Sequence, residues 1–165
     1  MLKLCGALLL LCVPVVLALG RYWAYRRRMD TIAALLQMLS FAADHIRSQL
    51  LSFSVLAETQ AEQGPERLRQ FWQRLMQEMQ SGGAPDPVWQ RELQRIVPQE
   101  EFRILQYYPA LLRSYDADQV AREITQLRAA LEACEREVRG RFRRDFKART
   151  GVQVAAAALL LILLI

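Results

Sequence analysis

The sequence is apolar at both ends and polar between them. Residues 4–19 are almost unbroken in apolar character, and so are residues 154–165. The stretch between these runs is dense in Arg, Glu and Gln. A helix needs about 20 predominantly apolar residues to span a bilayer. The pattern therefore predicts membrane anchors at residues 1–20 and 151–165 around one polar domain at residues 21–150.

The two predicted anchors differ in length. Residues 1–20 reach the usual length of a spanning helix, whereas residues 151–165 are short and include the polar Gln153. Snorkelling of Lys147 and Arg149 would help the second run to span. The first run also resembles a signal peptide, with small residues near Gly20 as a cleavage site. The arginines that follow it resist translocation, which favours an uncleaved anchor.

Basic residues flank both apolar runs on the side of the polar domain. They are Arg21, Arg26, Arg27, Arg28, Arg139, Arg141, Arg143, Arg144, Lys147 and Arg149. Lys and Arg next to membrane spans stay on the cytoplasmic side, so the domain is predicted to be cytoplasmic and both termini outside. The flanks also attract anionic membrane lipids. The other basic residues are roughly balanced by acids, so we expect no nucleic-acid partner.

The middle of the chain is predicted to be all-α. Its apolar residues recur three or four positions apart, which is typical of helices. Six helices are expected, near residues 26–49, 53–63, 65–80, 88–96, 102–112 and from 116 onward, with a kink at Pro109. Residues 81–87, rich in Gly and Pro, are predicted to form a loop. Asp116 is predicted to cap the last helix, with Gln119 three positions later.

The last helix carries an apolar seam with alternating four- and three-residue steps. Its members are Val120, Ile124, Leu127, Leu131, Cys134 and Val138. This spacing is typical of coiled coils. The seam is expected to pack within the chain, on the helix that carries the stripe from Ile32 to Leu50, or alternatively on a second subunit. The second possibility would make the protein a homo-oligomer.

No sequence motif for catalysis is found. The chain has neither a phosphate-binding glycine loop nor a nucleophile elbow. His45 is the single histidine, and Cys5 and Cys12 are remote from Cys134. The adjacent Glu100 and Glu101 are expected to diverge and to stabilise a helix start. We therefore expect no catalytic residue, no metal site and no cofactor.

Four parts of the sequence follow a known pattern: Met1–Leu4 with Gly6, Tyr25-Arg26-Arg27-Arg28, the segment Tyr107–Asp116, and the apolar ending from Gly151 to Ile165. In these parts and in its whole layout the chain resembles the stage III sporulation protein AB family. The chain departs from the family pattern at residues 46–53, which lack the usual proline step. Pro109 and Ser114 also stand where glycines are common in the family.

The resemblance implies a fold and a function. The fold would be a six-helix bundle similar to platform protein F of type II secretion, flanked by two transmembrane helices. The function would be that of a non-enzymatic platform subunit in a channel between mother cell and forespore. Its partners would be other channel subunits and a cytoplasmic secretion-type ATPase, and it would lie in the mother cell's outer forespore membrane.

Two segments are the predicted contact surface for these partners. They are the loop at residues 81–87 and the segment 107–118, together with exposed parts of the last helix. The candidate partner-binding residues are Tyr107, Tyr108, Arg113, Tyr115, Asp116 and Asp118. A two-anchor signalling adaptor that dimerises through the long-helix seam is the alternative. The large polar domain argues against a third possibility, a holin-like pore.

Overall fold

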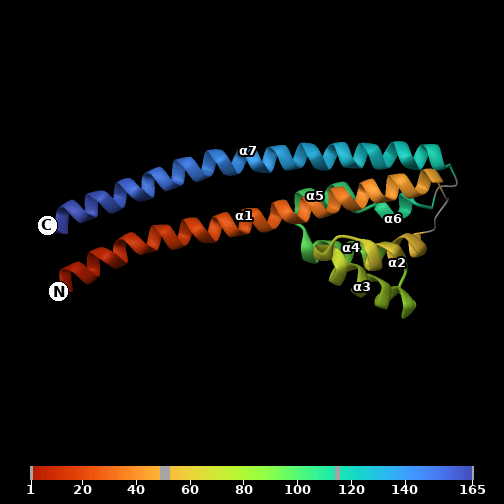
Figure 1. The fold of residues 1–165 in the computed structure, drawn as a ribbon, viewed down its shortest axis with the longest axis horizontal. Coiled ribbons are helices and arrows are strands. Elements are labelled where there is room, and N and C mark those ends of the chain that lie inside the picture. The colour runs from red at the N-terminus through yellow and green to blue at the C-terminus, as the bar shows by residue number, and fades with distance from the viewer. Residues whose placement is uncertain (1, 49–52, 114–115, 165) are drawn as a thin grey trace. The chain divides into compact units, whose positions relative to one another are not determined.

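The computed structural model describes the backbone of residues 2–48, 53–113 and 116–164 (Figure 1). Side chains are described at residues 13, 15–46, 53–113, 116–148 and 151. The helices are α1 (Leu2–Ser48), α2 (Phe53–Gln63), α3 (Glu66–Gln80), α4 (Pro85–Ile96), α5 (Gln99–Leu105), α6 (Tyr108–Leu111) and α7 (Ala117–Leu164). These residues contain no strand, so the predicted all-α class is confirmed. Leu50, Tyr115 and the side chain of Arg149 lie outside the described residues.

The chain divides into two compact units. The terminal unit is Met1–Arg27 with Arg136–Ile165, and the central unit is Arg28–Glu135. The terminal unit carries eleven basic and two acidic residues, a net charge of +9, whereas the central unit carries eleven basic and fifteen acidic residues, a net charge of −4. The charge of the chain is therefore divided very unevenly between its parts.

The two longest helices run without a break through the predicted domain boundaries. α1 continues past residue 20, and α7 continues past Gly140 and Gly151. Within the described residues, no helix combines the length and the apolar character that a membrane span requires. No helix therefore begins or ends at the predicted domain boundaries, after residue 20 and after residue 150, and these boundaries stay predictions.

Aromatic stacking joins the two helical segments of the terminal unit. The rings of Tyr25 in α1 and Phe142 in α7 are parallel, with centroids 3.9 Å apart and planes at 9°. Phe146 lies next to Phe142, at a centroid distance of 5.2 Å. Tyr22 and Trp23 are instead exposed. Residues more than a hundred positions apart in sequence are therefore neighbours here.

The central unit has one hydrophobic core, to which all seven helices contribute. Its aromatic centre consists of Phe53 from α2, Phe71 and Trp72 from α3, Trp89 from α4 and Tyr108 from α6. Trp89 lies 5.3 Å from Phe71, 5.8 Å from Trp72 and 5.2 Å from Tyr108, measured between ring centroids. Such pairs add about 0.5–1.5 kcal/mol each beyond their buried area. Trp89 is thus central to the packing of the short helices.

The loop predicted at residues 81–87 is shorter than expected. Residues 81–84 connect the helices, but Pro85 begins α4, because proline suits the first position of a helix, where the missing N–H costs nothing. Gly82 has a φ of 92°, which glycine adopts without strain. At Gly83 a Cβ would lie 2.8 Å from the Val88 side chain and 2.9 Å from the Glu78 carbonyl. The glycine pair therefore permits this tight turn.

The predicted helix at residues 102–112 is two helices. α5 ends at Leu105 and α6 begins at Tyr108, so the break precedes Pro109. Proline has no N–H to donate to the carbonyl four residues earlier, and its ring clashes with that carbonyl. A proline inside a helix therefore kinks or breaks it. In the first turn of α6, by contrast, proline is tolerated. Pro109 accordingly lies in the first turn of α6.

Candidate partner-binding surface

The structure brings the two predicted contact segments together in the central unit. Arg113, which follows α6, forms an ion pair with Asp86 in the first turn of α4. A buried hydrogen bond also joins α4 to α5, since the indole Nε1 of Trp89 donates to the Leu105 carbonyl at 2.8 Å. Residues 81–87 and 107–113 consequently form parts of one surface, although more than twenty positions separate them in sequence.

The side chains of segment 107–113 differ sharply in exposure. Tyr107 is 66 % exposed, the highest value among the exposed large apolar and aromatic residues of the described part. Tyr108, another predicted contact residue, is fully buried, so its ring belongs to the core. Burial raises the pKa of the Tyr108 phenol far above its usual range. Of this neighbouring pair, only Tyr107 is placed to meet a partner.

The two aspartates of the segment lie at the start of α7. The Asp116 carboxylate accepts hydrogen bonds from the backbone N–H groups of Asp118, at 3.0 Å, and Gln119, at 3.1 Å. The predicted cap is therefore present. The Gln119 side chain does not complete a reciprocal capping box, since its amide donates forward to Glu123 at 3.1 Å. Asp118 is exposed in the first turn, where an acid favours the helix dipole.

A shallow groove adjoins this surface. Its apolar lining comes from Leu111, Leu127 and Ala130, and its volume is about 500 Å³. The polar lining consists of Gln119, Arg122, Glu123 and Gln126. These four residues belong to the last helix, whose exposed parts were predicted to join the contact surface without being named one by one.

The seam of α7 is largely buried within the single chain. Val120, Ile124, Leu131 and Val138 are at most 5 % exposed, while Leu127 and Cys134 are partly buried. Val120, Ile124 and Leu131 belong to the same core as Ile32 of α1. This placement corresponds to the intramolecular alternative, since little of the seam is left uncovered for a second subunit.

Glu100 and Glu101 have a function that the sequence did not indicate. Both lie in the first turn of α5, as predicted, but they converge on Arg28 of α1, which donates to each at 2.7 Å. The expectation that they diverge was wrong, because one guanidinium presents nitrogens to both carboxylates. Burial alone would lower the pKa of Arg28, but the bonds to Glu101 and Glu100 outweigh it and raise that pKa.

The same corner is the group of side chains best placed to hold a metal ion in the described part of the chain. Ligand atoms of Glu100, Glu101 and Cys134 lie within 4.8 Å of one another. The Arg28 guanidinium already pairs with both carboxylates, so a metal cation would have to displace it. The arrangement therefore fits an ion pair better than a metal centre.

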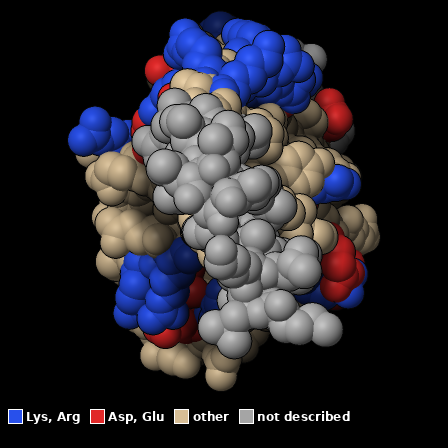
Figure 2. All heavy atoms as spheres, turned by 90° about the vertical axis from the view of Figure 1, so that its left-hand side faces the viewer, with Lys and Arg blue, Asp and Glu red and all other residues tan. Residues whose placement is uncertain are grey.

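The basic flanking residues separate into two groups. Nine of the ten belong to the terminal unit, and Arg28 alone belongs to the central unit. Among the nine, Arg26, Arg143, Arg144 and Lys147 are exposed, and Arg141 contacts Glu137 at 3.4 Å. Figure 2 shows Lys and Arg side chains gathered in groups on one face of the molecule. The flank thus remains mostly accessible, whereas Arg28 is committed to an internal ion pair.

Comparison with known proteins identifies relatives in one family. The profile of the family described as Stage III sporulation protein AB (spore_III_AB) matches residues 3–165. A solved structure of Stage III sporulation protein AB (SpoIIIAB) is similar in fold, with a TM-score of 0.58 and 16 % sequence identity. The match covers 70 % of this chain and 96 % of that one. No curated protein sequence is similar enough to count as a match.

Proposed function

Because the chain belongs to the stage III sporulation protein AB family, we propose that it is a membrane platform subunit of a sporulation complex. In this proposal it has no catalytic function and couples a cytoplasmic secretion-type ATPase to a channel between mother cell and forespore. Its fold would correspond to that of platform protein F of type II secretion. The protein would lie in the outer forespore membrane, with the central unit in the mother-cell cytoplasm.

The continuity of α1 and α7 is the observation that carries this proposal. Each helix passes from the basic terminal unit into the central unit without an interruption. A helix is a stiff element, so a displacement at one end is transmitted along it. The two apolar ends would be the membrane anchors, and the Lys and Arg residues that flank them would hold the flanks on the cytoplasmic side.

The ATPase or another channel subunit would contact the surface around Tyr107 and the Asp86–Arg113 pair. Tyr and Arg side chains, such as Tyr107 and Arg113, are enriched at protein interfaces and among the residues that dominate binding energy. The groove at Leu111 and Leu127 would admit an apolar side chain of the partner. This surface would then transmit force into α7, whose first turns line that groove.

The test is affinity purification of the cross-linked, detergent-solubilised protein from sporulating cells, followed by mass spectrometry. We expect recovery of a secretion-type ATPase and other channel subunits. Replacement of Tyr107 by Ala should reduce that recovery, while the control Val55→Ala, an exposed residue of α2, should not. Recovery of self-dimers alone would remove the platform proposal and favour the signalling adaptor.

Substitution of the seam separates these two functions. Leu131 is fully buried, so Leu131→Glu should unfold the central unit if the seam serves only the core. A dimerising adaptor would instead give disulfide-linked dimers through the partly buried Cys134 under mild oxidation. Folded Leu131→Glu protein that had lost its dimers would support the adaptor.

A further inference from the structure

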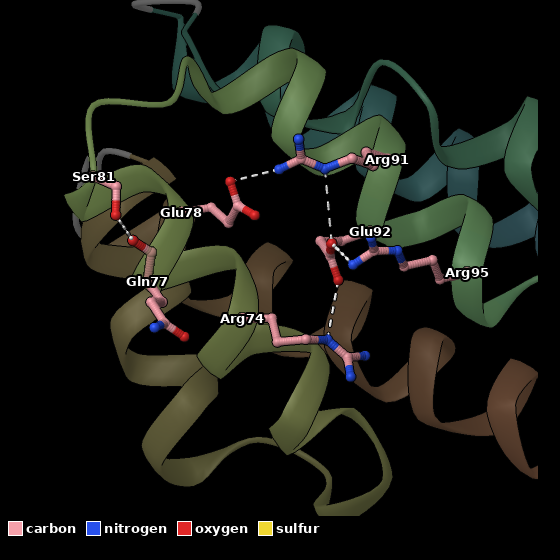
Figure 3. Close-up of polar contacts among 7 residues, drawn as sticks. All are labelled: Arg74, Gln77, Glu78, Ser81, Arg91, Glu92 and Arg95. Atoms are coloured by element: carbon pink, nitrogen blue, oxygen red, sulfur yellow. Dashed lines mark hydrogen bonds and ion pairs between the residues drawn. The ribbon is translucent and has the colours of Figure 1, made fainter.

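Three arginines surround one buried carboxylate on the pair of helices α3 and α4 (Figure 3). Glu92 is fully buried, and its Oε2 accepts from Nε of Arg74 at 3.0 Å. Its Oε1 accepts from Nη1 of Arg95 at 2.5 Å and lies 3.9 Å from Nε of Arg91. Arg91 also pairs with Glu78 at 2.6 Å. The cluster therefore has three positive and two negative charges.

The arginines keep unused donors that face solvent. Their side chains are 46 %, 50 % and 57 % exposed for Arg74, Arg91 and Arg95 respectively. Among the described residues, no partner is found for Nη1 and Nη2 of Arg74 or for Nε and Nη2 of Arg95. A guanidinium with two free N–H groups binds a carboxylate through a pair of parallel hydrogen bonds.

Glu92 holds these donors in position. A free arginine side chain loses conformational freedom when it binds, and that loss weakens binding. Here the buried carboxylate has already fixed Nε of Arg74 and Nη1 of Arg95, so less freedom remains to be lost. The cluster is thus preorganised for a second anionic group.

The charge of the surroundings restricts the kind of ligand. Residues 66–96 carry five basic and four acidic residues, whereas the rest of the central unit carries six basic and eleven acidic ones. The cluster is consequently a positive region on a negative unit. An anionic lipid surface or a nucleic acid would be attracted far more strongly by the terminal unit, whose net charge is +9.

The neighbouring side chains suit a polypeptide. The same two helices carry exposed glutamines: Gln70, Gln73, Gln77 and Gln80 in α3 and Gln94 in α4. Their amides offer both donors and acceptors to a peptide backbone. We propose that the surface formed by Arg74, Arg91 and Arg95 binds a carboxylate-rich segment of a partner protein. This surface is separate from the one around Tyr107 and does not depend on the proposed function.

The experiment uses the full chain in detergent, with a photo-cross-linking amino acid in place of Gln94. This position is exposed and three residues from Arg91, hence on the same helix face. The probes are a short peptide with Glu at alternate positions and the same peptide with Gln instead. Local cross-linking is required because the terminal unit also attracts acidic peptides. A cross-linker at the exposed Gln37 of α1 is the positional control.

We expect the Glu peptide to cross-link at position 94 at least about tenfold more than the Gln peptide. The double variant Arg74→Gln and Arg95→Gln should lose this difference, while Arg67→Gln with Arg69→Gln on the same helix α3 should keep it. Thermal unfolding of both variants checks that they are folded. Equal yields for both peptides, or no effect of the first double variant, would overturn the proposal.

A third variant separates preorganisation from simple attraction. Glu92→Gln makes the cluster more positive, so attraction alone would increase cross-linking to the Glu peptide. Loss of the fixed guanidinium positions should instead decrease it several-fold, in protein that circular dichroism shows to be folded at the temperature of the cross-linking. Competition by equimolar inorganic phosphate would show a general anion site, and a covalent dimer that excludes the peptide would assign the surface to a second copy. Either result would overturn the proposal.

Discussion

The two buried glutamates that pair with arginine, Glu92 and Glu101, have very different surroundings. Both are fully buried in the central unit. Glu101 has a bond from Arg28 to Oε1, and its buried Oε2 has no hydrogen-bond partner in the described part of the structure. Both oxygens of Glu92 accept hydrogen bonds, and three arginines lie within 4 Å of it.

The difference distinguishes an internal tie from a surface that can bind. Arg28 is only 26 % exposed and joins α1 to α5 across seventy-three positions of sequence. Each arginine around Glu92 is about half exposed. Arg74 and Arg91 join the consecutive helices α3 and α4, whereas Arg95 pairs with Glu92 within α4. We therefore expect the loss of the single partner at the first site to destabilise the fold strongly, and the loss of one of three arginines at the second site to matter little.

Loss of Arg28 should have the largest effect. Arg28→Ala leaves Glu101 as a buried charge without its counter-ion, which costs about 3–5 kcal/mol. The measurement is chemical denaturation of the detergent-solubilised chain, followed by circular dichroism. The control Arg26→Ala, at an exposed position, should change the unfolding free energy by less than about 0.5 kcal/mol. Similar unfolding free energies for the two variants would contradict a stabilising role of the ion pair between Arg28 and Glu101.

Neutralisation of Glu92 should have the next largest effect. Glu92→Gln keeps the shape of the side chain but weakens its bonds to charged donors, at a cost of about 1–3 kcal/mol. The matched control is Glu78→Gln, because Glu78 is 47 % exposed and its one ion pair within the described part of the chain is with Arg91. Exposed pairs contribute about 0–1 kcal/mol, so this variant should be near the parent in the same denaturation experiment. Equal losses would show that burial of Glu92 is unimportant.

Removal of one arginine from the Glu92 cluster should have a small effect. Arg95→Gln leaves Arg74 and Arg91 beside the carboxylate, so we expect a loss of at most about 1 kcal/mol. Arg28→Gln, made in parallel, should lose several times more, because no second arginine pairs with Glu101 among the residues that the structure describes. A larger loss for Arg95→Gln than for Arg28→Gln would reverse the comparison.

The smallest effect concerns a neutral buried group without a partner. The Tyr108 hydroxyl has no hydrogen-bond partner among the described residues. Tyr108→Phe should therefore leave the free energy of unfolding unchanged or raise it by up to about 1 kcal/mol, with a thermal midpoint at or slightly above that of the parent. Tyr108→Ala, which removes the ring from the aromatic centre, should cost about 3–5 kcal/mol. A clear loss in Tyr108→Phe would show that the hydroxyl has a partner in solution.

The sequence predicted most helices because local rules determine them. Three- and four-residue spacing located the stripe of α1 and the seam of α7, and the carboxylate of Asp116 capped α7 as expected. The errors occurred at prolines. Pro85 and Pro109 were assigned to a loop and to a kink, but each lies in the first turn of a helix, where its fixed φ is favourable.

The contact surfaces were much less predictable. Nothing in the sequence distinguishes Tyr107 from Tyr108, since exposure depends on how α6 packs against Trp89. Likewise Glu92 resembles any helix-surface acid until α3 places Arg74 beside it. The adjacent acids Glu100 and Glu101 were understood only in part, because their shared partner lies on α1.

The sequence by itself determined the helical class, the apolar ends with their basic flanks, and the family. These properties follow from composition and from spacing along the chain, which tertiary packing does not alter. Only the tertiary structure decided which carboxylates are buried, which arginines neutralise them and which aromatic side chains remain exposed. Burial and ion pairing depend on distances between helices that are far apart in the sequence, so no local pattern records them.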